Sequence, residues 1–336
     1  MNLDTPYLGL RLRNPLIASA SPENADLDHL RRLDDAGIGA VVLPSLFQEQ
    51  LEAQQNDYDA ILAAHADNSP EAQTYLPPLE TGPYGLGPEH HLDLVRRAKA
   101  SLSVPVIASL NGSSDTGWTG YASLLEGVGA DALELNLYDV PVDISVSGQD
   151  IEQRYLNVLR AVRTAVQIPV VVKMAPYFSS IGHMATRFVD AGANGLVIFN
   201  RYLQPDIDLV RMALSSELEL STPSEIHLPL LWTALLAGRV KASLAASTGV
   251  EHIDEVVKYL LAGADVVMTT AAILRHGPEY IHTLLADLAT WLEIRQLESL
   301  DRIRGQLSWA RAKKNESYIR ANYLHLIKTF ARAHHR

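Results

Sequence analysis

One short phrase recurs four times in this chain of 336 residues and limits the folds open to it. In each copy, a helical stretch ends in glycine and alanine, and a run of mostly aliphatic residues follows at once. The copies read DAGIGAVVL, GVGADALEL, DAGANGLVI and LAGADVVM. Repetition of a helix followed by a strand is typical of βαβ units, whose strands pair in parallel. The phrase therefore predicts an α/β protein with a parallel sheet.

Strand-like and helical runs alternate over most of the chain, which predicts a (β/α)8 barrel, the TIM-barrel fold. The expected strands are 16–20, 40–43, 104–110, 132–137, 170–174, 195–200, 241–246 and 265–269. The expected helices are 27–36, 92–101, 120–129, 150–166, 181–191, 230–237, 253–262 and 271–292. Residues 8–14 predict a small N-terminal hairpin that closes the barrel floor.

Two connections exceed the usual length, at 44–88 after the second strand and at 201–227 after the sixth. Connections of this length tend to be lids or substrate loops. We divide the chain into a barrel domain, 1–292, and a C-terminal helical extension, 293–336. Within that extension, 297–312 (LESLDRIRGQLSWARA) predicts an amphipathic helix that packs against the barrel or a neighbouring subunit.

Composition narrows the classes of function. A formal net charge of −11 argues against nucleic-acid binding, and no stretch approaches the ~20 apolar residues of a membrane span. The N-terminus shows no secretory signal, so we expect a cytoplasmic protein. Cysteine is absent, which excludes thiolate nucleophiles and cysteine-bound metals. The twelve histidines show no metal-binding spacing, so we expect no metal site, and we expect the pair at 90–91 on the surface.

Lys173 closes the strand-like run IPVVVKMA. In a parallel barrel, the carboxyl ends of the strands converge on one mouth, where the chemistry takes place. A lysine at such an end needs an anionic or electron-rich partner, because an unpaired buried ammonium group is costly. Two interpretations remain open, namely contact with a cofactor and a structural pair with a carboxylate of the barrel.

Small residues follow the seventh and eighth expected strands, at 247–249 and 269–270. In this fold the backbone N–H groups of those two loops commonly bind phosphate. Simple helix capping would use the same groups and leaves the same sequence pattern. Asn136 and Asn200 end two further strands, and their amides suit a planar heterocycle because each supplies donors and an acceptor.

Six phrases resemble the dihydroorotate dehydrogenases, in the same order and with sensible spacing: NPLIASAS, PVIASLNG, GADALELNL, PVVVKMAP, GLVIFN and TGVEHIDEVVKYLLAGADVVMTTAAILRHGP. The resemblance covers almost the whole barrel and is stronger to the soluble, fumarate-linked class. It implies that FMN lies across the mouth. Ala18 and Ser19 would then contact the flavin, and Asn136 and Lys173 would hold its ring and ribityl region. Asn200 would lie beside flavin and substrate, with Asn136 also touching substrate. The phosphate would bind at Thr248, Gly249, Thr269 and Thr270.

Several positions depart from the family pattern. Pro44 and Ser45 stand where the family usually carries a lysine, and the phrase GPYGLGP, from Gly82, lacks an asparagine that binds orotate. The family's catalytic loop, NLSCPN, here reads NLYDVP. Asp139 replaces the catalytic base, with Ser145 and Ser147 as weaker candidates, and Pro141 replaces another asparagine. The chain is identified as a member of a dihydroorotate dehydrogenase-like branch that lacks some catalytic residues.

The resemblance implies an FMN-dependent oxidoreductase that acts on CH–CH bonds of a small molecule, with Asp139 and Lys173 as catalytic candidates. In the family reaction, part of pyrimidine synthesis, a base removes a C5 proton from dihydroorotate and hydride passes from C6 to flavin N5. Two alternatives are a flavin-binding protein without dihydroorotate turnover and an FMN-free barrel enzyme for a sugar phosphate. Asp139 could equally be a solvated loop carboxylate. The extra C-terminal helices and the resemblance together favour a homodimer, and nucleic-acid or membrane partners are not expected.

Overall fold

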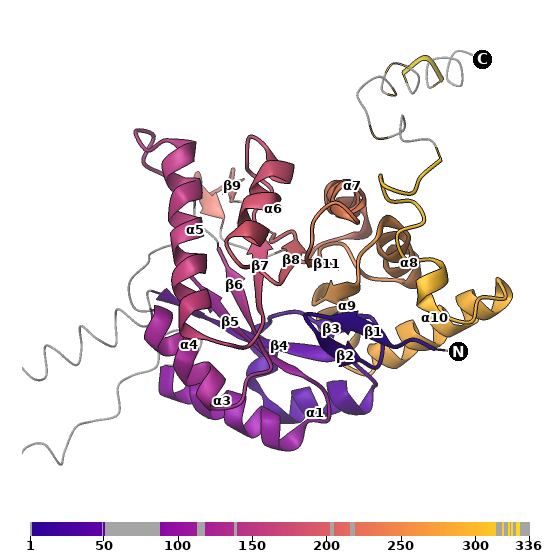
Figure 1. Cartoon of the computed structure of the whole chain (residues 1–336), viewed down its shortest axis with the longest axis horizontal. Helices are drawn as coiled ribbons and strands as arrows, with labels where there is room; N and C mark the ends of the chain where they lie inside the picture. The colour runs from indigo at the N-terminus through magenta and orange to yellow at the C-terminus, as the bar shows by residue number, and fades with distance from the viewer. Residues whose placement is uncertain are drawn as a thin grey trace, which may run out of the picture.

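The computed structural model describes residues 2–48, 50, 88–112, 118–137, 140–201, 205–215 and 219–313, and a few positions of the tail beyond them. Eight parallel strands close into a barrel at the centre of the molecule, with helices around it (Figure 1). The strands are β3 (Leu16–Ala18), β4 (Ala40–Phe47), β5 (Val106–Asn111), β6 (Ala132–Asn136), β7 (Val170–Met174), β8 (Gly195–Ile198), β11 (Ser243–Ala246) and β12 (Val266–Thr269). The predicted (β/α)8 barrel is confirmed.

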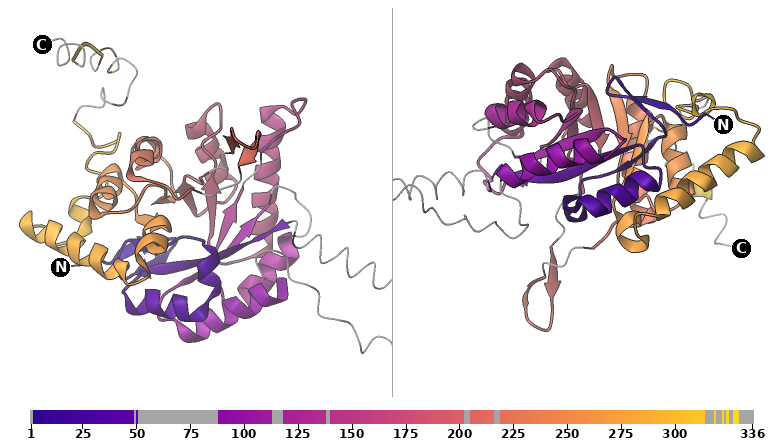
Figure 2. Two further views of the ribbon diagram at one scale, coloured as in Figure 1. Left: turned by 180° about the vertical axis from the view of Figure 1, so that it is seen from behind. Right: turned by 90° about the horizontal axis from the view of Figure 1, so that it is seen from below.

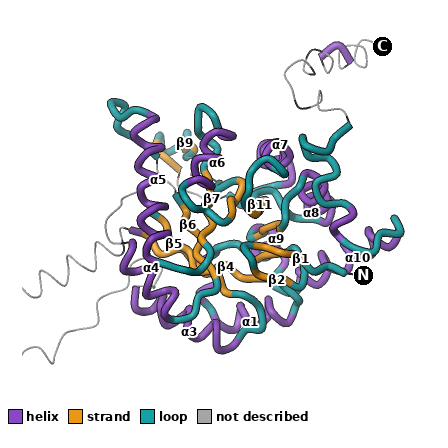
Figure 3. Tube along the Cα trace, in the orientation of Figure 1, coloured by secondary structure: helices purple, strands orange, loops and turns teal. Residues whose placement is uncertain are grey.

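Each barrel strand is followed by helix, and the helices form the outer layer seen in the tube drawing (Figure 3). They are α1 (Leu27–Asp35), α3 (Pro88–Ser101), α4 (Trp118–Gly127), α5 (Gly148–Ala165), α6 (Ile181–Asp190), α7 (His227–Leu236), α8 (Ile253–Ala262), α9 (Ala271–His276) and α10 (Tyr280–Ile294). The single helix expected over 271–292 was wrong. Gly277, with φ of 85°, ends α9, and Pro278 follows it before α10 begins.

Alternation along the strands divides their side chains between two cores. In β7, the side chains of Val170 and Val172 belong to the core between strands and helices, whereas Val171 belongs to the core inside the barrel. Successive side chains of a strand point to opposite faces, so Lys173 also points inward, one layer above Val171. The strand sequence thus directs a lysine into the barrel interior.

The N-terminal hairpin closes the floor of the barrel, as predicted. Strands β1 (Thr5–Tyr7) and β2 (Leu10–Leu12) pair in an antiparallel ladder. Tyr7 and Leu12 are buried among the inward-facing side chains of the barrel strands. The floor is therefore filled with apolar side chains, and the opposite end remains for a binding site.

The second barrel strand is longer than expected. We predicted that it ends at residue 43 and that Pro44 opens a loop, but β4 continues to Phe47. The pairing of β4 with β5 shifts register between Val42 and Ser45, which gives a bulge at Pro44. A bulge accommodates proline within a strand because the missing N–H group would have no partner there. Pro44 and Ser45 therefore lie at the rim of the barrel rather than in a loop.

Most of the first long connection, 44–88, lies outside the described residues. The second carries an antiparallel hairpin, β9 (Asp206–Asp208) and β10 (Ala213–Ser215), which projects away from the barrel (Figure 2). A 3-10 helix, η3 (Pro223–Ile226), then leads into α7.

The tail segment 297–312 is not the predicted α-helix. It contains the 3-10 helix η4 (Leu300–Arg302) followed by turns. The N–H groups of Gly305 and Leu307 donate to carbonyls at the end of α8, and that of Trp309 donates to Ala234 O, at 2.8–2.9 Å. Hydrogen bonds to α7 and α8 replace the hydrogen bonds that an α-helix would make within itself. The segment therefore packs on the barrel as expected, but as a 3-10 helix and turns. None of the described helices combines the length and apolarity that crossing a bilayer requires.

Candidate functional site

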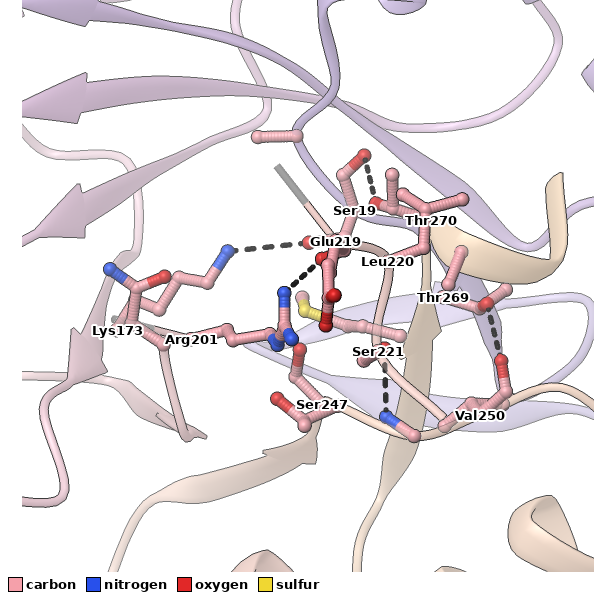
Figure 4. A pocket seen from close by; sticks show the side chains of 16 residues that line it. Ser19, Lys173, Arg201, Glu219, Leu220, Ser221, Ser247, Val250, Thr269 and Thr270 are labelled. Carbon is pink, nitrogen blue, oxygen red and sulfur yellow. Dashed lines mark hydrogen bonds between the residues drawn. The ribbon is translucent and has the colours of Figure 1, made fainter. Parts of the chain in front are cut away.

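A cavity of about 180 Å³ lies at the carboxyl ends of the barrel strands, bordered by β3, β7, β8, β11 and β12 (Figure 4). It is lined by Ser19, Ala20, Lys173, Asn200, Arg201, Glu219, Leu220, Ser221, Ser247, Thr248, Gly249, Val250, Met268, Thr269, Thr270 and Ala271. Most of the predicted cofactor residues meet here. Ala18 is fully buried in the core between strands and helices and is not part of the lining.

Lys173 pairs with a carboxylate that the sequence analysis missed. Its Nζ atom lies 3.6 Å from Glu134 Oε1 and 3.3 Å from Ser19 Oγ. The Glu134 side chain is completely buried, and its other oxygen, Oε2, has no hydrogen-bond partner. Lys173 is therefore paired with a barrel carboxylate, as the structural interpretation predicts, and it also lines the cavity. The sequence does contain a signal for Glu134, since it is a charged residue at an inward-facing position of a buried strand.

The Glu134 carboxylate belongs to a buried polar chain inside the barrel. Ser109 Oγ donates to Glu134 Oε1 at 3.4 Å, and Ser45 Oγ lies 2.7 Å from Ser109 Oγ. The Tyr7 hydroxyl has no hydrogen-bond partner, and burial raises its pKa well above the usual value, with a further rise from the charge of Glu134. The Lys173–Glu134 ion pair thus lies inside the barrel, next to serine hydroxyls and to the apolar side chains of the inner core.

The two predicted asparagines contact each other at the mouth. Asn200 Nδ2 donates to Asn136 Oδ1 at 3.0 Å. In the barrel register Asn136 pairs with Lys173 on one side and with Asn111 on the other. Three polar side chains from adjacent strands therefore lie at one level and point inward, as strand alternation requires.

The loop after β11 has an uncommon backbone. Thr248 and Gly249 both have positive φ, 81° and 74°. A β-branched residue at positive φ is strained and needs support from its surroundings. The Tyr259 hydroxyl lies 2.8 Å from Thr248 O and 3.1 Å from Ser247 O, and so bridges both carbonyls of the loop.

Gly249 lies against another segment of the chain. A Cβ atom at this position would lie 2.8 Å from Thr222 O and 3.1 Å from Ile226 N. The chain itself therefore makes the close approach. The N–H group of Gly249 points toward the Ser221 hydroxyl oxygen at 3.2 Å, an acceptor that an anion could replace.

Three residues of the second long connection, Glu219–Ser221, line the cavity and are called the wall segment below. Its Glu219 carbonyl accepts from Arg201, and its Leu220 and Ser221 carbonyls accept from Arg275 at 3.3 and 2.9 Å. In Figure 4 the side chains of Lys173 and Arg201 extend toward Ser19 and the wall segment. Sequence reasoning missed the wall segment because its position depends on these long-range bonds.

The two threonines at the end of β12 hydrogen-bond to neighbouring loops. Thr269 Oγ1 donates to Val250 O at 2.9 Å, and Thr270 Oγ1 donates to Ser19 O at 3.3 Å. These bonds tie the loops after β3, β11 and β12 together. They fix the positions of the backbone N–H groups that face the cavity.

A second cavity, of about 200 Å³, borders the first at Ala20. It is lined by Ala20, Ser21, Pro22, Pro44, Ser45, Phe47 and Gln50. Two proline rings and a phenylalanine ring make its walls, and no lining residue among those described is charged. Ten of the sixteen residues that line the first cavity are polar or charged, whereas the second is lined mainly by apolar side chains.

His91 is buried next to Pro44, which lines the second cavity, whereas the sequence analysis placed it on the surface. It is 1% exposed, and its Nε2 atom lies 2.9 Å from Pro44 O, an acceptor that requires a proton on Nε2. Burial lowers the pKa of His91 to about 4, and the hydrogen bond to Pro44 O raises it by a smaller amount. The Tyr121 hydroxyl lies 3.2 Å from Nδ1 and donates to Pro88 O at 2.7 Å. A neutral imidazole therefore holds the bulge of β4.

The remaining predicted residues are either outside the described part of the chain or have local roles. Asp139 and Gly82 lie outside the described residues, so the proposed base is not placed. Ser147 caps α5, and Ser145 Oγ donates to Asp143 at 2.6 Å, which gives both serines local structural roles. In the described ranges no three side chains of His, Asp or Glu converge as metal ligands would.

Comparison with known proteins identifies related chains. No protein-family model matches this sequence. It is 30% identical over 210 residues to a protein assigned as dihydroorotate dehydrogenase A (fumarate) from Aeropyrum pernix, covering 60% of this chain and 67% of the relative. It is 26% identical to the catalytic subunits of dihydroorotate dehydrogenase B (NAD(+)) from Methanothermobacter thermautotrophicus and Pyrococcus abyssi, covering 90% of this chain and at least 97% of each relative. Together with the closed barrel and the polar mouth, these similarities show that the chain belongs to the dihydroorotate dehydrogenase family.

Proposed function

We propose that this protein is an FMN-dependent oxidoreductase that acts on a CH–CH bond of a small substrate. The observation that carries the proposal is the buried Lys173 at the mouth cavity, next to the Asn136–Asn200 pair and opposite the loops after β11 and β12. Relatives of this chain are named as dihydroorotate dehydrogenases, which supports the reaction class.

The donors around the cavity fit FMN. An ammonium group and two carboxamides at one level suit the nitrogen and oxygen atoms of an isoalloxazine edge. The hydroxyl oxygen of Ser221 already accepts from the Gly249 N–H group, so a phosphate oxygen could take over that bond. The two bordering cavities, about 180 and 200 Å³, together reach the range of about 300–1,000 Å³ that small-molecule sites occupy, and we assign the first to the cofactor and the second to the substrate.

Each residue has a stated task in this proposal. Lys173 is held by Glu134 and donates to the ring. Asn136 and Asn200 orient ring and substrate through their amides. Thr248, Gly249, Thr269 and Thr270 position the phosphate, and Ser19 lies beneath the ring. When bound, FMN would supply the hydride-accepting group, and Asp139 would remove the proton from the substrate carbon.

The first test is an absorbance spectrum of the purified chain with and without added FMN. We expect stoichiometric binding, with resolved bands of protein-bound flavin. A chain that neither carries nor takes up FMN would contradict the proposal and favour the sugar-phosphate enzyme. Anaerobic dihydroorotate is the second test. Rapid bleaching would show the family reaction, whereas a yellow protein that does not bleach needs another substrate or binds flavin without turnover.

We also propose that the chain forms a homodimer through the β9–β10 hairpin. Leu209, Val210 and Met212 are 85%, 93% and 88% exposed, and a two-stranded ribbon with such side chains is marginally stable in water unless it is covered. Light scattering of the wild type and of Val210→Asp tests this point. We expect a dimer that the substitution dissociates, and a monomeric wild type would contradict it.

A further inference from the structure

The connections on the mouth side of the barrel are poor in cations. Between β4 and α3, the 40 residues 48–87 contain seven Asp and Glu and no Lys or Arg. The connections after β3, β5, β6 and β7 contain no Lys or Arg either. This is a property of the sequence, so it does not depend on the path of any loop.

The cations that do occur there are already paired. The connection after β8 holds two arginines, of which Arg201 lies 2.9 Å from a carboxylate oxygen of Glu225 and Arg211 lies 3.6 Å from that of Asp208. Lys173, at the end of β7, is compensated by Glu134. Among the described residues, no cation that lines either cavity is left over to balance a substrate carboxylate.

The second cavity offers an apolar surface in the same place. Pro22, Pro44 and Phe47 form its walls. The hydroxyl groups of Ser21 and Ser45 supply polar atoms, and Pro22 and Pro44 have no N–H group to donate to an anion. Burying a carboxylate against such walls is unfavourable without a paired cation, whereas burying an uncharged ring is favourable.

We propose that the subsite beside the flavin accepts an uncharged, largely apolar molecule and discriminates against carboxylates. This inference rests on the proposed function, because it takes FMN to occupy the polar cavity and leaves the apolar one for substrate. The phosphate of FMN does not conflict with it, since backbone N–H groups of the loops after β11 and β12 can bind that anion without a cation. Dihydroorotate, orotate and fumarate, which all carry carboxylates, are then poor ligands of this chain.

The test compares two ligands of nearly equal shape and different charge. FMN is first added and its binding confirmed from the flavin spectrum. The holoprotein is then titrated with benzamide and with benzoate, and binding is followed as a flavin difference spectrum. We expect benzamide to bind at least about tenfold more tightly. Equal binding, tighter binding of benzoate, or binding of neither ligand would overturn the inference while the proposed function stands. Failure of FMN to bind would instead overturn the proposed function, and this inference with it.

A charge-restoring variant provides the second arm. Phe47 lies at the open side of the cavity, 37% exposed, so Phe47→Lys places an ammonium group there without burying it fully. We expect Phe47→Lys to improve benzoate binding about tenfold relative to Phe47→Gln, which removes the ring but adds no charge. Equal benzoate affinities in the two variants would show that missing charge does not exclude carboxylates, and circular dichroism checks that both variants are folded.

Discussion

The two sides of the barrel mouth are built differently. On the side of β8, β11 and β12, the cavity is polar, its loops are tied together by threonine and tyrosine hydroxyls, and arginines hold the wall segment. On the side of β3 and β4, the cavity has proline and phenylalanine walls and no charged lining residue among those described. The polar side keeps the residues by which the family resemblance was recognised, whereas the β4 side departs from that pattern. In the proposed function, the first cavity binds the cofactor and the second binds the substrate.

The largest effect is expected from separating the Lys173–Glu134 pair. Lys173→Met leaves Glu134 buried without a cation, and we expect the free energy of unfolding to fall by about 3–5 kcal/mol. Replacing both residues, as Lys173→Met with Glu134→Leu, removes the buried charge and should recover most of that loss. Urea unfolding measures both. FMN titration of the double variant then separates stability from binding, and wild-type affinity there would show that the polar side is not the cofactor side.

The second prediction concerns the support of the apolar side. Between pH 6.5 and pH 4 the unfolded chain takes up a proton on His91 that the folded chain does not, because burial lowers the pKa of His91 to about 4. The stability contribution is therefore complete above pH 6.5 and decreases toward pH 4, by at most about 3 kcal/mol. His91→Gln keeps a donor for Pro44 O but does not titrate. We expect the difference in stability between the two proteins to shrink as the pH falls, and a constant difference would place the titrating group elsewhere.

A smaller effect is expected at the strained loop of the polar side. Tyr259→Phe removes the hydroxyl that bonds to Ser247 O and Thr248 O, at a cost of about 1–2 kcal/mol. FMN affinity should fall several-fold, because the N–H groups of the loop are no longer held in place. Tyr280→Phe is the matched control, since that hydroxyl pairs with His252 away from the cavity lining. Equal FMN affinities in both variants would separate the loop from cofactor binding.

The smallest effect is expected from Ser221→Ala. The substitution removes the acceptor of the Gly249 N–H group and should cost at most about 1 kcal/mol in the apoprotein. If a phosphate oxygen replaces the serine hydroxyl, FMN affinity will not decrease. Calorimetric titration measures the FMN affinity. A tenfold loss of affinity would mean that Ser221 binds FMN directly instead of being displaced from Gly249 by the phosphate.

Local pattern was enough to predict the fold and much of the polar side. Periodicity gave the barrel, and helix 253–262 has the predicted limits, because a helix ending in glycine before a buried strand is encoded in a few neighbouring residues. Lys173 was placed at the mouth because it closes a buried strand-like run at its carboxyl end. These features depend on short-range rules, which a sequence displays directly.

Features that depend on tertiary contacts could not be predicted. Glu134 pairs with Lys173 only because β6 and β7 are neighbours, and the wall segment is placed by arginines from other elements. His91 was taken for a surface residue because its partner, Pro44, was assigned to a loop instead of to β4. One error in the length of a strand thus hid both the buried imidazole and the apolar cavity in front of it.

The wall segment has a kinetic consequence. Glu219, Leu220 and Ser221 each accept a hydrogen bond from Arg201, Arg275 or the loop after β11. We expect a molecule seated against them to leave faster when these hydrogen bonds are weakened. Salt or denaturant at concentrations that do not unfold the barrel weakens such bonds.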